Sequence, residues 1–81
     1  MKRTRLQLYR EILELLQSGP KGKTQIVYGC NLGFRPAAGY LRDLAEKGLI
    51  EDAPERQYRI TAKGLAALST MEKLETLGAL Q

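Results

Sequence analysis

Residues 24–50, TQIVYGCNLGFRPAAGYLRDLAEKGLI, decide the fold of this chain. They predict two helices joined by a tight corner and followed by a strand. Thr24 can cap the first helix with its hydroxyl, and Asn31 can adopt the left-handed backbone conformation that ends it. Gly48 can end the second helix in the same way, and apolar residues then lead into an extended segment. The positions expected to be buried recur at helical spacing; they are Ile26, Val27 and Cys30 in the first helix and Phe34, Ala37, Leu41, Leu44 and Ala45 in the second.

The second helix presents a different side opposite these apolar positions. Gly33 opens the helix in place of a hydroxyl cap. Pro36 in the first turn removes no hydrogen bond, because first-turn N–H groups have no partners within the helix. The side opposite the apolar positions carries Arg35, Gly39 and Arg42. We expect the function of the chain on this side.

Charge is distributed unevenly along the 81 residues. Residues 1–42 hold eight basic side chains and two acidic ones, a net charge of +6, whereas residues 43–81 hold five basic and seven acidic ones, a net charge of −2. This asymmetry places positive potential around the two helices and the N-terminus, where Lys2, Arg3 and Arg5 could also contact phosphate, as a polyanion-binding surface requires. The solvated face of a basic protein would have the same composition, so charge alone leaves both readings open.

Length and residue usage exclude several classes of function. A chain of 81 residues has room for one domain with a modest core. One cysteine and no histidine exclude a disulfide framework, a zinc finger and histidine-based acid–base catalysis within one chain, and Cys30 is expected in the core. No segment is apolar enough for a signal peptide or a membrane span. We expect a cytoplasmic protein that is not an enzyme and needs no metal, cofactor or small-molecule ligand.

An amphipathic helix is predicted ahead of the two-helix unit, over residues 4–18. Gly19 and Pro20 stop it. Its outer side contains acidic residues, which favours a helix that packs on the core over a helix that lies on a membrane. The expected buried stripe consists of Leu6, Tyr9, Ile12, Leu13 and Leu16.

Residues 18–23, SGPKGK, have the composition of a loop. The Gly22-Lys23-Thr24 sequence matches the end of the phosphate-binding loop of nucleotide hydrolases, but Gln17 stands at the leading glycine position and a helix precedes the loop. That interpretation is therefore rejected. Lys21 and Lys23 remain at the entrance of the next helix, where they are well placed for a DNA phosphate.

The segment after Ile50, EDAPERQYRIT, predicts a β-hairpin with its tip at residues 53–56. Tyr58 and Ile60 alternate with polar residues, so one face of the hairpin should pack on the core. Acidic residues surround the tip. We therefore expect only a weak contact with phosphate, carried by Arg56 and Arg59.

Thr61 is a good N-cap for a final helix that runs from Ala62 to about Leu80. Its apolar residues recur every third position, a step that turns about 300°, so the apolar stripe winds around the helix. Leu65 and Leu68 are expected to pack on the first helix. A disordered tail after about Glu75 is the alternative to a helix of this length. The residues expected to pair with the same helix of a second subunit are Met71, Leu74, Leu77 and Leu80.

The order helix, helix, turn, helix, hairpin, helix resembles winged helix-turn-helix DNA-binding proteins. The resemblance is closest to archaeal winged helix-turn-helix transcriptional regulators and the related small dimeric chromosomal DNA-binding proteins. The residues that carry it are Lys23-Thr24, Ile26, Tyr28-Gly29, Asn31-Leu32, Tyr40-Leu41, Leu44, Gly48-Leu49-Ile50, Tyr58, Ile60-Thr61 and Lys63-Gly64. Gly33 and the acidic hairpin depart from the pattern.

This resemblance implies a mainly α fold with a small β-hairpin, in which a three-helix core carries a wing and a C-terminal helix. Residues 1–61 would form the winged helix-turn-helix domain, and residues 62–81 would form a dimerisation helix. The helix after the corner would enter the major groove, so the expected partners are double-stranded DNA and a second copy of the chain. A winged-helix module that binds protein instead of DNA, and a non-specific nucleoid-associated protein, are the alternative functions.

Residue chemistry then predicts how DNA would be contacted. Arg35 can reach a base edge, Arg42 a phosphate and Ala38 a thymine methyl group, so we expect phosphate contacts to dominate a modest sequence preference. Gly39 either permits close approach to DNA or relieves crowding against another helix, and Tyr28 either packs or bonds phosphate. The complete expected DNA-binding set is Lys21, Lys23, Thr24, Tyr28, Arg35, Ala38, Gly39, Arg42, Arg56 and Arg59.

Overall fold

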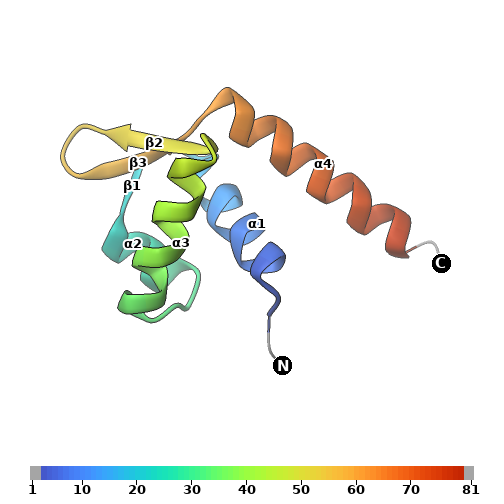
Figure 1. The fold of residues 1–81 in the computed structure, drawn as a ribbon, viewed down its shortest axis with the longest axis horizontal. Helices are drawn as coiled ribbons and strands as arrows, with labels where there is room; N and C mark the ends of the chain where they lie inside the picture. The colour runs from blue at the N-terminus through green and yellow to red at the C-terminus, as the bar shows by residue number, and fades with distance from the viewer. Residues whose placement is uncertain (1–2, 80–81) are drawn as a thin grey trace.

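A computed structural model describes residues 3–79, so the expectations for Lys2 and Leu80 fall outside the described part of the chain. The elements are α1 (Arg5–Leu16), β1 (Lys21–Gly22), α2 (Lys23–Gly29), α3 (Phe34–Glu46), β2 (Ile50–Ala53), β3 (Gln57–Ile60) and α4 (Ala62–Ala79). The first three helices form a bundle, the β2–β3 hairpin extends from one end of it, and α4 leaves on the other side (Figure 1). The predicted mainly α fold with a wing is confirmed. None of the helices in residues 3–79 combines the length and the apolar character needed to cross a bilayer.

Thr4 caps α1 as part of a capping box. Its Oγ1 accepts a hydrogen bond from the N–H of Gln7 at 3.1 Å, and the Gln7 side chain accepts one from the N–H of Thr4 at 2.8 Å. The buried stripe of α1 contains Leu8, whereas Leu6 is 56% exposed, so the prediction for Leu6 was wrong. Leu6 lines a shallow cleft between α1 and α4 together with Met71, and α4 does not cover it.

The sheet has three antiparallel strands in the order β1-β3-β2. Lys21 pairs with Tyr58 in β3, and Asp52 in β2 pairs with the other side of Tyr58. The prediction of a plain loop at residues 18–23 was therefore wrong at residues 21–22, which form β1. A strand of two residues is too short to show alternating apolar and polar positions in the sequence. The pairing keeps the backbone extended up to Gly22, which becomes the N-cap of α2 in place of Thr24.

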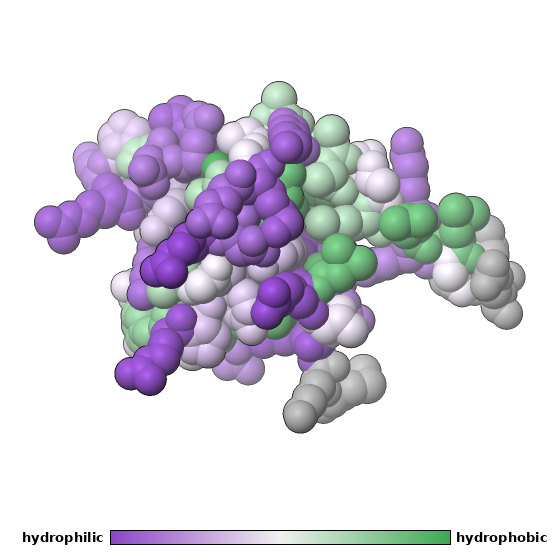
Figure 2. All heavy atoms as spheres, in the orientation of Figure 1, coloured by the Kyte–Doolittle hydropathy of each residue, from purple (hydrophilic) through white to green (hydrophobic). Residues whose placement is uncertain are grey.

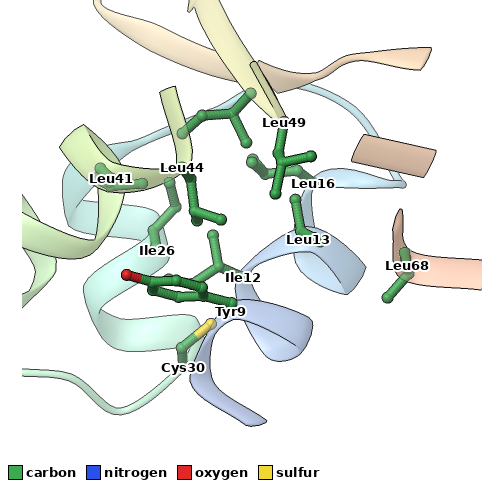
Figure 3. Packing of buried hydrophobic residues seen from close by; sticks show 11 residues of the cluster. Tyr9, Ile12, Leu13, Leu16, Ile26, Cys30, Leu41, Leu44, Leu49 and Leu68 are labelled. Atoms are coloured by element: carbon green, nitrogen blue, oxygen red, sulfur yellow. The ribbon is translucent and has the colours of Figure 1, made fainter. Parts of the chain in front are cut away.

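One apolar cluster joins α1, α2, α3, the start of β2 and one residue of α4. Its side chains point toward one another between the elements (Figure 3). The predicted core positions that are confirmed as buried are Tyr9, Ile12, Leu13, Leu16, Ile26, Val27, Cys30, Ala37, Leu41, Leu44 and Leu68. Phe34 and Ala45 are exposed, contrary to prediction, because Phe34 lies at the very start of α3, beyond the core, and Ala45 lies on a flank of that helix.

Both predicted left-handed positions are confirmed. Asn31 has φ 53° at the corner between α2 and α3, and Gly48 has φ 75° after α3. Thr61 caps α4, because its Oγ1 accepts a hydrogen bond from the N–H of Gly64 at 3.0 Å and donates one to the carbonyl of Gly48 at 2.6 Å. These bonds attach the first turn of α4 to the segment that follows α3.

Gly64 explains why Leu65 is 46% exposed when it was expected to pack on α1. A Cβ atom at Gly64 would lie 2.1 Å from the carbonyl oxygen of Leu49, so α4 rests on the backbone at this point. Gly64 and Leu68 are four residues apart and share one side of the helix. Leu65 is turned about 100° away from that side.

We predict that Gly64→Ala destabilises the protein by about 1–3 kcal/mol, because the added methyl group overlaps backbone that is anchored by Thr61. Gly78→Ala in the same helix is the matched control, since a Cβ there meets nothing within 4 Å. It should leave the free energy of unfolding unchanged or raise it by up to about 1 kcal/mol. Urea denaturation of the two variants measures the difference, and equal stabilities would contradict the close contact.

Candidate nucleic-acid interface

Hydrogen bonds hold the corner between α2 and α3, and their donors belong to residues outside the two helices. The N–H of Leu32 donates to the carbonyl of Val27 at 2.8 Å. The Arg3 guanidinium donates to the carbonyls of Cys30 at 2.7 Å and Asn31 at 3.0 Å. Arg3 also forms an ion pair with Glu11 at 2.9 Å. The expectation that Arg3 contacts phosphate is therefore replaced by a structural role, in which its charge is balanced and its donors satisfy the corner.

The other end of α3 is anchored to α1 through Asp43. The Tyr9 hydroxyl donates a hydrogen bond to the Asp43 carboxylate, and the Lys47 ammonium group donates another at 2.6 Å. Burial, with the hydrogen bond to Asp43, raises the pKa of Tyr9 to about 12. The hydrogen bonds from Lys47 and Tyr9 lower the pKa of Asp43. Tyr40 packs against Tyr9 with ring centroids 5.9 Å apart, partly buried at the edge of the core.

The outward side of α3 is open to solvent, as the sequence predicted. Arg35, Gly39 and Arg42 are exposed, and neither arginine forms an ion pair with another residue between 3 and 79. A Cβ at Gly39 would meet nothing within 4 Å, so crowding inside this chain does not explain the glycine. Ala38 is half-buried on the flank of this side. The surface therefore combines two uncompensated cations with a smooth, small-residue helix.

Arg42 shares a shallow depression between α1 and α3 with a further cation, Arg5 of α1. Two carboxylates line the same depression: Asp43, which pairs with Lys47, and Glu46, which forms no ion pair with either arginine. Hydrophilic side chains cover the face on which α3 lies, whereas hydrophobic side chains gather along α4 (Figure 2).

Three expected contacts come from α2. Lys23 is its first residue, and Thr24 and Tyr28 are exposed one turn apart on its outer side. Packing in the core is thereby ruled out for Tyr28, which is 73% exposed. Lys21 instead donates hydrogen bonds to the Ser18 hydroxyl at 3.0 Å and the Gly19 carbonyl at 3.3 Å. The structure thus places Lys23 at the N-terminus of α2 and holds Lys21 against the preceding loop.

The wing is less basic than its arginines suggest. Arg59 lies opposite Glu51 in the strand pairing and forms an ion pair with it at 3.4 Å. Arg56 is exposed at the tip, where it and Glu55 both have positive φ angles, 58° and 63°. One uncompensated arginine therefore remains at the tip, beside an exposed carboxylate.

The charge of this surface follows the asymmetry expected from the sequence, since residues 21–42 contain four basic side chains and no acidic one. Reasoning from the sequence missed the aromatic contact. Phe34 lies outside the core, 48% exposed, with its ring edge-to-face against Tyr28 at a centroid distance of 6.1 Å. The sequence signal was the place of Phe34 directly after the N-cap, because a first-turn residue can project beyond the end of a core.

Comparison with known proteins agrees with this architecture. A family model described as winged helix-turn-helix matches residues 2–78. The chain belongs to this family. An uncharacterized protein from Methanocaldococcus jannaschii is 30% identical over 73 residues, which are 90% of this chain and 74% of that protein. The predicted resemblance to winged helix-turn-helix proteins is confirmed.

Two solved structures superpose on nearly the whole chain. Sso10a-2, a DNA-binding protein from Sulfolobus solfataricus, matches with a TM-score of 0.80 and 25% identity, over 95% of this chain and 83% of that protein. ZitR from Lactococcus lactis matches with a TM-score of 0.73 and 20% identity, over 99% of this chain and 59% of that protein. At that identity, the likeness to ZitR shows a shared fold alone.

We predict that alkaline pH destabilises the protein through Tyr9. The ordinary pKa of tyrosine is 10.0 and that of folded Tyr9 is about 12, so the unfolded chain loses this proton first as the pH rises. The stabilisation is complete below pH 10 and is lost between about pH 10 and pH 12. Urea denaturation across this window should show a smaller fall in stability for Tyr9→Phe than for the wild type. Tyr28→Phe removes an exposed hydroxyl, so its free energy of unfolding should fall with pH as that of the wild type does. If the Tyr9→Phe protein showed the same fall as the wild type, Tyr9 would not be the source of the pH dependence.

Proposed function

We propose that this chain is a DNA-binding transcriptional regulator that binds duplex DNA with α3 in the major groove. The observation that carries the proposal is the pair of exposed arginines, Arg35 and Arg42, on the outward side of α3, without an ion pair among residues 3–79. Residues 21–42, which include both arginines, contain no acidic residue that would repel phosphate. Membership of the winged helix-turn-helix family and the structural likeness to Sso10a-2, a DNA-binding protein, support it.

The contacts divide into one that specifies sequence and several that provide affinity. Arg35, in the first turn of α3, reaches a base edge, while Arg42 and Lys23 bind phosphates on either side of the groove. Gly39 and Ala38 let the helix approach the bases closely. Thr24, Tyr28 and Arg56 add exposed donors to the phosphate contacts. Lys21 and Arg59 contribute less, because each already has a partner within the chain.

Phosphate-driven binding predicts a steep dependence on salt. If each subunit neutralises about six phosphates, affinity for duplex DNA should fall roughly a thousandfold between about 50 and 200 mM salt. Titration of a fluorescent duplex across this range measures the slope. A flat response, or no binding at low salt together with a stable complex with another protein, would favour a protein-interaction module instead.

Two single variants separate the two kinds of contact in the same assay. Arg35→Ala should reduce the discrimination between different duplexes by about 1–3 kcal/mol. Lys23→Ala should weaken binding to all duplexes similarly and lower the salt slope by about 1. If both variants acted alike, α3 would not be the helix that reads bases.

The same proposal includes a homodimer formed through α4. Leu74 and Leu77 are 58% and 59% exposed, and Met71 is half-buried beside Leu6 in the cleft between α1 and α4. An apolar surface of this kind is stabilised when the same surface of a second chain covers it. Two copies of α3 would then read sites about one DNA turn, or a multiple of it, apart. Such a protein would act at the nucleoid.

We predict that Leu74→Glu makes the protein monomeric, because the new carboxylate would be buried in the pairing surface without a partner. Thr76→Glu is the matched control, since it adds the same charge to an exposed position on another side of α4. Sedimentation with and without a short duplex reports subunit number and DNA binding together. A wild-type protein that sediments as a monomer in both conditions would remove the dimer from the proposal.

A further inference from the structure

Tyr28 and Phe34 form an aromatic pair on the surface at the point where α2 meets the first turn of α3. The two rings are 6.1 Å apart between centroids, at an interplanar angle of 89°. Tyr28 is 73% exposed and Phe34 is 48% exposed. Core packing therefore does not account for Phe34, although its residue type and helical spacing suggest it. We refer to these two residues as the aromatic pair.

The aromatic pair lies within a stretch of the chain that carries basic residues and no acidic one. No acidic residue occurs between Lys21 and Arg42, and Arg35 directly follows Phe34. The outward side of α3 near the pair is otherwise poor in hydrogen-bonding groups, because Pro36, Ala38 and Gly39 have no polar side-chain atoms. The surface therefore combines an apolar patch with positive charges around it. Such a surface is complementary to a polyanion that has negative phosphates on the outside and apolar groups on its base edges.

We infer that the aromatic pair contacts thymine methyl groups in the major groove and gives this chain a preference for thymine near the first turn of α3. This inference rests on the proposed DNA-binding function. The thymine C5-methyl is the apolar group on the major-groove base edges, and phenylalanine is among the side chains that contact it. First-turn residues of a recognition helix are the ones that meet base edges. Phe34 makes the contact, and the perpendicular ring of Tyr28 packs against it.

The geometry of the aromatic pair disfavours a platform for single-stranded nucleic acid. Successive bases stack on aromatic faces that lie parallel to them. The rings of Tyr28 and Phe34 are almost perpendicular, so the two cannot accept consecutive bases of one stacked strand. A methyl group, by contrast, needs only an apolar surface and no particular ring plane.

The test compares two duplexes of the same A·T-rich sequence, one with thymine and one with deoxyuridine at every thymine position. Deoxyuridine lacks only the C5-methyl group, so phosphate contacts are the same in both duplexes. Each buried methyl group should strengthen binding roughly fourfold. The wild type should therefore bind the thymine duplex at least about fourfold more tightly at low salt.

Variants assign the preference to the aromatic pair. Phe34→Ala should lose most of the preference, leaving only the part that a methyl contact to Ala38 provides. Leu65→Ala is the matched control, because it truncates a similarly exposed apolar side chain on α4, and it should keep the preference. Tyr28→Ala is the second variant and should reduce the preference without abolishing binding. Circular dichroism confirms that each variant is folded.

The outcomes separate this inference from the proposed function. Equal wild-type affinity for the two duplexes would overturn the methyl contact and leave DNA binding in place. A preference that persists undiminished in both Phe34→Ala and Tyr28→Ala would also overturn it, because the preference would then come from other residues or from DNA shape. Absence of binding to either duplex at low salt would overturn the proposed function itself.

Discussion

Burial of one side of α3 is the constraint on which the candidate interface depends. Ala37, Leu41 and Leu44 are at most 2% exposed against the rest of the core. This packing alone determines which side chains of α3 face solvent. The helix is also anchored at its two ends, by Arg3 at the preceding corner and by the Tyr9–Asp43 hydrogen bond. Recognition in a groove requires a rigid helix with a fixed outward side. If α3 rotated about its axis, Arg35 would turn away from solvent and residues that are now buried would take its place.

Ion pairing accounts for the net positive charge of this side. The five ion pairs recorded within residues 3–79 involve the acids Glu11, Glu14, Asp43, Glu51 and Glu75. Their basic partners are Arg3, Arg10, Lys47 and Arg59. No cation between residues 21 and 42 is among these partners. Five of the nine acidic residues therefore balance positive charge elsewhere, and the cations of α2 and α3 keep theirs. Exposed surface pairs contribute little stability, so their placement matters more for the electrostatic field than for the fold.

Several contacts set the position of α4 relative to the bundle, including the burial of Leu68 and the Thr61 hydrogen bond to Gly48. Gly64 brings the first turn of α4 onto the backbone of Leu49, and Arg10 of α1 forms an ion pair with Glu75 at 2.7 Å. The direction of α4 is thus coupled to the core that orients α3. In a dimer paired through α4, these same contacts would determine the distance between the two recognition helices. The wing, with Arg59 compensated by Glu51, contributes less to such a complex.

The sequence by itself determined the features that depend on neighbouring residues: the helices, the left-handed positions at Asn31 and Gly48, the hairpin and the Thr61 cap. These follow from backbone preferences and local hydrogen bonds, which a short window of sequence contains. Only the tertiary structure decided that Phe34 and Leu65 are exposed, that β1 pairs with β3, and that Arg3 and Arg59 have partners within the chain. Periodicity shows which residues share a side of a helix, but not how far the core extends along it. The interface is therefore a property of the tertiary structure, because exposure and charge compensation depend on residues far apart in the sequence.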